Sequence, residues 1–179
     1  MKNPIEKVAG VVEQKLLENP STIKSPGKIF KFINRFPLFF YQIGLGGLIV
    51  GPFLRITTIG RVSGRPRHTM LEFIDDSADG NPIILSGWGG RSDWVKNLRK
   101  NPRIKVSKGW RSFPALAQEI PLEEAAGLLE DYFRKMPGMG QIMAKRAGVV
   151  LDGSREKLLE LADKHPSFRL IKQNPDNQL

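Results

Sequence analysis

The residues in this sequence best suited to chemistry are three closely spaced arginines. They lie in the stretch ITTIGRVSGRPR, residues 56–67, as Arg61, Arg65 and Arg67. Guanidinium groups are planar and donate paired hydrogen bonds to phosphate or carboxylate oxygens. Gly60 and Gly64 permit a tight turn whose backbone N–H groups point outward. The stretch therefore predicts an anion-binding loop, and a solvated arginine-rich hairpin is the alternative.

A second glycine-rich stretch follows further along the chain. It covers residues 86–91 as SGWGGR, and Ser92 then stands where the N-cap of a helix is expected. The N-terminus of such a helix has free backbone N–H groups, which suit an anion or the edge of a planar ring. Trp94, Asn97 and Leu98 fall on one face of that helix. For Trp94 and Leu98 the alternative is ordinary core packing.

Composition narrows the class of partner. The 179 residues carry a formal net charge of +10, with a pI near 10.0. This charge favours an anionic partner, namely a polyanionic cofactor, nucleic acid or anionic lipid. The aromatic residues do not alternate with Lys and Arg in a nucleic-acid motif, which argues against specific nucleic-acid binding. The chain has no cysteine and two histidines, so we expect neither a disulfide nor a metal site, and we expect a cytoplasmic protein.

The order of predicted elements indicates an α+β protein with a mainly β core. Strand-like segments end at residue 59 and recur at 69–74, 83–85, 103–108 and 110–120, with a strand or buried stretch at 149–151. Strands that follow one another through short turns favour a barrel of about six mostly antiparallel strands, with flanking N- and C-terminal helices. We expect one domain over 1–179: an N-terminal helical extension (1–50), a barrel core (52–120) with an inserted helix near 92–100, and a C-terminal helical part (121–179).

One long stretch, from Phe36 to Leu54, contains no charged residue. Its length would suit a membrane span, but Pro37, Pro52 and several glycines divide it into short pieces. We expect it to pack across one opening of the barrel, with an interfacial anchor or a true span as alternatives. The segment 26–54 also permits weak contact with a membrane surface, as in a cytoplasmic protein that is peripheral to the membrane.

Two blocks of sequence resemble one known family. Residues 57–67, TTIGRVSGRPR, are similar to the T-T-x-G-R-K-S-G-x-x-R signature of the deazaflavin-dependent nitroreductases, and residues 94–106, WVKNLRKNPRIKV, are similar to their W-Y-x-N-L-x-x-N-P-x-V-x-V signature. The resemblance spans about half the chain, from Leu54 to Pro137. It implies a split β-barrel related to flavin-binding barrels. It also implies an oxidoreductase that passes a hydride from reduced coenzyme F420 to a nitroaromatic, quinone or other electron-poor acceptor.

The resemblance also assigns roles to residues. It implies that the phosphate and polyglutamate tail of the cofactor are held by Arg61, Ser63, Gly64, Arg65 and Arg67. Near the deazaflavin ring it places Thr69, Met70, Ser86, Gly87, Trp88, Gly89, Trp94 and Asn97. Tyr132 and Met136 are candidates for the acceptor pocket, with a methionine-rich packing seam as the alternative. We expect no essential catalytic side chain, because the cofactor supplies the chemistry of hydride transfer.

Two departures from the family pattern keep alternatives open. Val62 stands where the family usually has lysine, and Val95 replaces the tyrosine after the tryptophan. These changes leave FMN as an alternative cofactor. A non-catalytic barrel that binds haem, another tetrapyrrole or lipid is the alternative of a different class. The sequence also permits a homodimer.

Overall fold

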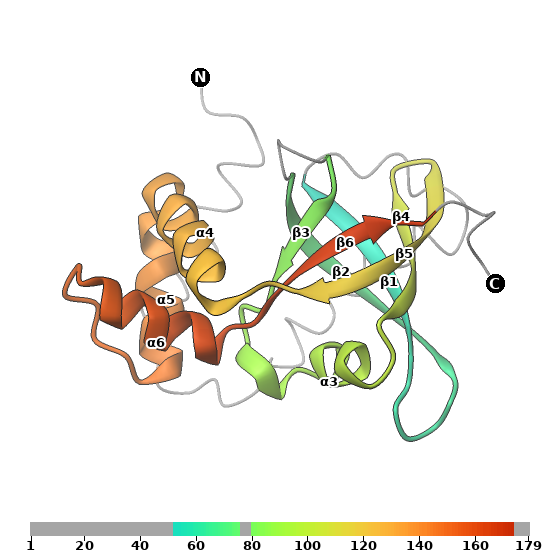
Figure 1. Ribbon diagram of the computed structural model, residues 1–179, viewed down its shortest axis with the longest axis horizontal. Coiled ribbons are helices and arrows are strands. Elements are labelled where there is room, and N and C mark those ends of the chain that lie inside the picture. Colours follow the sequence, from blue (N-terminus) through green and yellow to red (C-terminus); the bar gives the residue numbers. More distant parts are fainter. Residues whose placement is uncertain (1–51, 76–79, 174–179) are drawn as a thin grey trace. The chain divides into compact units, whose positions relative to one another are not determined.

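The computed structural model describes residues 52–75 and 80–173, which form two compact units (Figure 1). The barrel unit contains residues 52–120 and 166–173, and the helical unit contains residues 121–165. The predicted N-terminal extension and most of the uncharged segment from Phe36 lie outside the described residues. The predictions about these two segments therefore stay predictions. The prediction of a single domain also stays a prediction.

The barrel unit is a closed barrel of six antiparallel strands. The strands are β1 (Phe53–Ile59), β2 (Pro66–Asp75), β3 (Pro82–Leu85), β4 (Arg103–Lys108), β5 (Arg111–Glu119) and β6 (Ser167–Lys172). Their order around the barrel is β1-β2-β3-β6-β5-β4. Between β3 and β4 the chain forms a 3₁₀ turn, η2 (Gly89–Arg91), and the helix α3 (Asp93–Lys100). The predicted α+β class with a six-stranded antiparallel barrel is confirmed.

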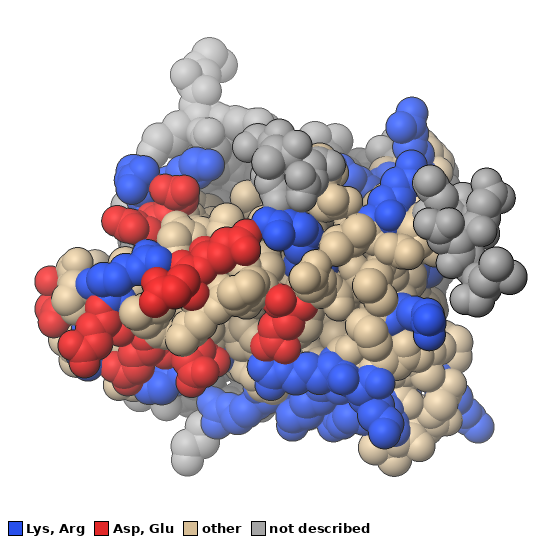
Figure 2. All heavy atoms as spheres, viewed as in Figure 1, with Lys and Arg blue, Asp and Glu red and all other residues tan. Residues whose placement is uncertain are grey.

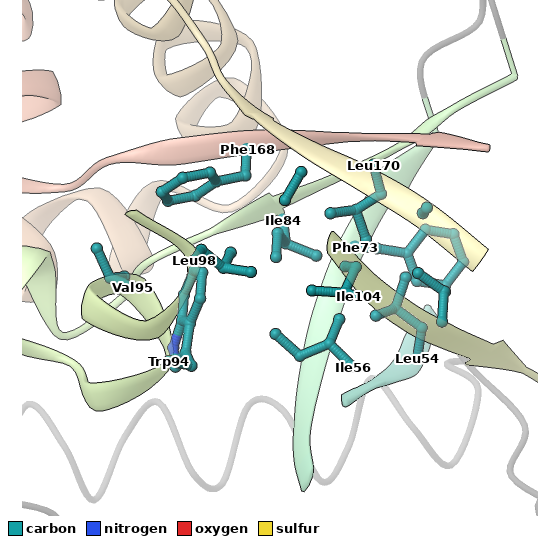
Figure 3. Close-up of a cluster of buried hydrophobic side chains, with 13 residues drawn as sticks. Leu54, Ile56, Phe73, Ile84, Trp94, Val95, Leu98, Ile104, Phe168 and Leu170 are labelled. Carbon is teal, nitrogen blue, oxygen red and sulfur yellow. The ribbon is translucent and has the colours of Figure 1, made fainter. Parts of the chain in front are cut away.

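Period-two alternation determines which side chains enter the barrel. In β1 the side chains of Leu54, Ile56 and Thr58 are fully buried, and the residues between them are partly or fully exposed. β-Branched residues suit this pleated, half-buried setting. The inner faces of the other strands join β1, and α3 closes one end with Trp94 and Leu98 (Figure 3). The ring of Trp94 meets that of Phe168 edge-on, with centroids 5.8 Å apart.

The helical unit consists of α4 (Leu122–Lys135), α5 (Pro137–Ala147) and α6 (Arg155–Lys164). The helix α6 begins at a serine cap, because Ser154 Oγ accepts a hydrogen bond from the Lys157 backbone N–H at 3.3 Å. Close packing joins α4 to α5 at Gly140, where an added Cβ would lie 2.8 Å from the ring of Phe133.

The C-terminal part differs from the prediction at one element. Residues 121–179 were expected to be helical, but Ser167–Lys172 forms β6 and closes the barrel between β3 and β5. The reason is its alternation: Phe168 and Leu170 are buried in the core, and Arg169 and Ile171 are more exposed. The stretch at 149–151 forms neither helix nor strand; Val149 is buried there and Val150 is exposed.

Candidate functional site

The arginine loop connects β1 to β2 beside the end of the barrel that α3 closes. Two backbone hydrogen bonds shape it, from Gly60 N–H to the Arg65 carbonyl (2.9 Å) and from Gly64 N–H to the Gly60 carbonyl (2.8 Å). Gly64 has φ +64°, a left-handed conformation that favours glycine. A Cβ at Gly60 would lie 2.8 Å from Ser63 Oγ and 3.2 Å from the Arg65 carbonyl oxygen. Both glycines therefore suit the tight turn that the sequence predicts. The prediction that their backbone N–H groups point outward is wrong, because both groups donate to carbonyl oxygens within the turn.

Arg61 is bound to α3. Its Nη1 contacts Asp93 Oδ1 at 2.9 Å and Asn97 Oδ1 at 3.2 Å, and its backbone N–H donates to the same Asn97 oxygen at 3.1 Å. Asn97 is 4% exposed, and its Nδ2 donates to the buried Thr58 Oγ1 at 3.3 Å. Sequence reasoning did not include Asp93 or Thr58 in the site. Thr58 is the second threonine of the block at residues 57–67, whereas no motif marks Asp93.

The other two arginines of the loop are exposed. Arg67 Nη2 lies 3.5 Å from Ser63 Oγ, which also accepts from the Arg65 backbone N–H at 3.4 Å. Within the part of the chain that the structure describes, the Arg65 guanidinium has no hydrogen-bond or ion-pair partner. Arg65 and Arg67 therefore present cationic donors to solvent at the start of β2, a donor set that fits a phosphate or carboxylate.

The Gly-rich loop before α3 is held by Ser86. This serine is 1% exposed, and its Oγ donates to the Gly89 carbonyl at 2.7 Å and lies 3.3 Å from Ser92 Oγ. Gly89 has φ +71°. The Ser92 side chain makes no capping hydrogen bond to α3, although Ser92 does occupy the N-cap position as predicted. The Ser86 side chain thus shapes the loop, and a ligand near it would meet Gly87 and Trp88, which are partly exposed.

Of the residues predicted to lie near the ring, Trp94, Thr69 and Met70 do not lie on one common surface. Trp94 is 8% exposed and belongs to the barrel core, which is the alternative considered for it. Thr69 pairs with Ile56, whose side chain points inward, and Met70 pairs with Arg55 on the opposite face of the sheet. Adjacent strand residues point to opposite faces, so Thr69 and Met70 cannot both contact a ligand on one face.

The two candidates for the acceptor pocket belong to the helical unit. Tyr132 lies in the last turn of α4, with its ring centroid 6.1 Å from that of Phe133. Met136 is the C-cap of the same helix. Both are partly exposed. Their role at the acceptor stays a prediction.

Positive charge gathers around α3 and β4. Figure 2 shows Lys and Arg side chains along the lower edge of the view, where Figure 1 places α3. The exposed cations of this segment and the loop are Arg61, Arg65, Arg67, Arg91, Lys96, Arg99, Lys100, Arg103 and Lys105. Two carboxylates are engaged with members of this set: Asp93 pairs with Arg61, and Glu119 forms a two-pronged pair with Arg99 at 2.6 and 3.0 Å. The surface retains an excess of positive charge, which attracts anions.

His68 lies on the outer face of β2, next to the arginine loop. Its Nδ1 is 3.0 Å from Thr57 Oγ1 on the paired strand. The pKa of His68 is lowered from its usual value, first because partial burial disfavours the charged ring and second because the Arg55 guanidinium repels it. The ring is therefore biased toward its neutral form, in keeping with a strand histidine.

Residues 52–75 and 80–173 contain neither a cluster of metal-binding side chains nor a helix that could span a membrane. No group of three or more His, Asp or Glu side chains there is placed to hold a metal ion. No helix within these ranges is both long and apolar enough to cross a membrane.

Comparison with known families shows to which family the chain belongs. Residues 41–149 match the family described as F420H(2)-dependent quinone reductase. The match covers more than half of the 179 residues and includes both sequence blocks, the arginine loop and α3 with β4. The chain belongs to this family. Its cofactor is coenzyme F420, and the predicted F420-dependent oxidoreductase is confirmed at this level.

Solved structures with a similar chain path include proteins of several kinds. An F420-H2 dependent reductase, FDR-A, shares 20% identity over 66% of this chain and 93% of its own, with a TM-score of 0.48. HutZ, a haem storage protein from Vibrio cholerae, shares 16% identity over 69% and 82%, with a TM-score of 0.45. A putative pyridoxamine 5'-phosphate oxidase from Listeria innocua shares 12% identity over 78% and 94%, with a TM-score of 0.46. Likeness at this level says nothing about function.

Proposed function

We propose that this protein reduces a quinone with reduced coenzyme F420, and that the arginine loop binds the anionic part of the cofactor. Two facts support the proposal. The chain belongs to a family described by this activity. The loop presents Arg65 and Arg67 to solvent on a backbone that is already folded into a tight turn.

The loop fits the chemistry of this cofactor. The coenzyme carries a phosphate and a polyglutamate tail, both of which are anionic. Guanidinium groups bind such oxygens through charge-assisted hydrogen bonds, which are about twice as strong as neutral ones. Ser63 adds a hydroxyl group beside these two arginines.

The reaction needs positioning more than acid–base groups. When bound, the reduced deazaflavin supplies a hydride. A quinone that accepts this hydride and one proton becomes a hydroquinone, so two electrons pass from cofactor to acceptor. The protein contributes orientation and charge, and we assign no side chain as an essential acid or base. Nitroaromatics and other electron-poor acceptors remain candidates, because the same hydride transfer serves them.

The test is turnover with a defined pair of reactants. Purified full-length protein is mixed with reduced F420 and either a soluble benzoquinone or a nitroaromatic, and absorbance reports the oxidation of the cofactor. We expect quinone-dependent oxidation that scales with protein concentration. Failure of every electron-poor acceptor to oxidise the cofactor, with a protein that binds it, would overturn the proposed activity. Oxidation with nitroaromatics alone would overturn the quinone assignment.

A further inference from the structure

We propose that Asn97 is a positioning residue, which fixes the arginine loop on α3 and does not itself contact the cofactor. The inference rests on the proposed function of that loop. It differs from the role that family resemblance implied, in which Asn97 forms part of the wall around the ring. The difference arises from what the side-chain amide of Asn97 binds in the structure.

The amide of Asn97 is used almost completely within the protein. An asparagine amide can accept two hydrogen bonds and donate two. Oδ1 accepts both from Arg61, one from the backbone N–H at 3.1 Å and one from Nη1 at 3.2 Å. Nδ2 donates to Thr58 Oγ1 at 3.3 Å. Because both Arg61 groups can only donate, the atom that faces them has to be the oxygen. At 4% exposure, Asn97 has little surface left for a ligand.

These contacts connect three elements at one point. Asn97 lies in the middle of α3, Thr58 lies near the end of β1, and Arg61 is an early residue of the arginine loop. Asp93, one turn earlier on α3, also holds the Arg61 guanidinium at 2.9 Å. The loop is therefore attached to the helix through Arg61, and its remaining arginines project from that fixed base.

The attachment of the loop to α3 raises the affinity for the cofactor although Asn97 itself does not contact the cofactor. A loop that is already folded loses less conformational freedom when an anion binds, so its affinity is higher. When the attachment is removed, the loop samples other conformations, and cofactor binding weakens. The number of cation–anion contacts in the bound state stays the same. The salt dependence of binding should then stay the same too, because screening acts on those contacts.

The test compares Asn97→Ala with Asn97→Asp. For Asn97→Ala we expect the dissociation constant for F420 to rise about tenfold at every salt concentration, with an unchanged slope against salt. We expect the KM for reduced F420 to rise similarly and kcat to stay within about twofold. Asn97→Asp keeps both oxygen contacts to Arg61, so its affinity should stay within about threefold of the wild type. Direct contact with an anionic cofactor predicts the opposite, since a carboxylate there would repel it.

Asn101→Ala is the matched control. Asn101 lies just beyond the same helix, and its Oδ1 accepts from the Arg103 backbone N–H at 3.1 Å. Its loss removes a similar bond away from the loop, and we expect a small change in melting temperature with unchanged affinity. Wild-type affinity in a folded Asn97→Ala protein would overturn the inference. So would a strong loss in Asn97→Asp accompanied by a changed salt slope, and this comparison also decides the matter if Asn97→Ala does not fold.

Failure of the proposed function gives a separate result. If wild-type protein does not bind F420, the loop is not a cofactor site, and the proposal for Asn97 falls with it. If the wild type binds and Arg65→Ala weakens binding, the loop is the site. The Asn97 variants then test the positioning role alone.

Discussion

At the scale of single residues, the three loop arginines are not equivalent. The sequence presents Arg61, Arg65 and Arg67 as similar donors, whereas the structure commits Arg61 to Asp93 and Asn97. Contacts between positions more than thirty residues apart depend on how α3 packs, which no local pattern reveals. The sequence could therefore predict an anion-binding loop, but not which of its arginines is available.

Removal of an available arginine should weaken cofactor binding. We expect Arg65→Ala and Arg67→Ala each to lower the affinity for F420 by about 1.5 kcal/mol, roughly tenfold, because a charge-assisted hydrogen bond is lost. Calorimetric titration measures this. Arg111→Ala is the control, since Arg111 is exposed on β5, away from the loop. Unchanged affinity in both loop variants would make the loop a solvated hairpin.

Addition of a cation at Val62 should strengthen binding. Val62 is 90% exposed in the loop, so a longer side chain meets no packing obstacle. It also stands where the family usually has lysine. We expect Val62→Lys to raise the affinity for F420 by about two- to fivefold at low salt, the size typical of an exposed ion pair. Val150→Lys, at another exposed valine, is the control. Equal effects of both substitutions would point to net charge instead of a specific contact.

His68 should make stability depend on pH. Its pKa is lowered in the folded protein, so the unfolded chain takes up the proton at higher pH. Folded stability should therefore be full above the ordinary pKa near 6.5 and decrease as the pH falls below it. We expect His68→Gln to lose less stability than the wild type between about pH 8 and about pH 5.5 in thermal melts. Parallel losses in the two proteins would contradict this.

At the scale of elements, sequence pattern predicted those with clear periodicity and capping. β1 alternates buried and exposed residues, and the last helix begins at a serine cap, so both were found. β6 was missed although Phe168 and Leu170 alternate with more exposed residues, because it directly follows a helix in a part of the chain that was expected to be helical. The core role of Trp94 was also undecided, since a tryptophan on a helix face suits either a ligand or a core.

Packing between α4 and α5 gives a test at this scale. An added Cβ at Gly140 would lie 2.8 to 3.1 Å from three ring carbons of Phe133. We expect Gly140→Ala to destabilise the protein by about 1–2 kcal/mol, because the clash outweighs the gain in helix propensity. Gly127→Ala is the matched control within α4, where no atom of the described residues beyond the helix's own backbone lies within 4 Å of the added Cβ. That variant should be neutral or up to about 1 kcal/mol more stable in denaturant unfolding. A stabilised Gly140→Ala would contradict the packing.

At the scale of the whole molecule, positive charge is concentrated in the barrel unit. Residues 52–120 and 166–173 contain fourteen Lys and Arg against six Asp and Glu, whereas residues 121–165 contain seven against eight. The net charge of the chain thus identified the class of partner, and the structure locates the excess around α3, β4 and the arginine loop. The charge distribution says less about the acceptor. Its two candidate residues, Tyr132 and Met136, belong to the helical unit, where acidic and basic residues nearly balance.

The most direct measurement is a calorimetric titration of the full-length protein with F420 and, separately, with FMN, at about 50 mM and about 500 mM salt. We predict saturable binding of F420 at low salt that weakens at high salt, because exposed arginine–anion contacts are screened. We predict weaker binding of FMN, which has a phosphate but no polyglutamate tail. Binding of FMN without binding of F420, or F420 affinity that does not change with salt, would contradict the assignment of the arginine loop as the cofactor site.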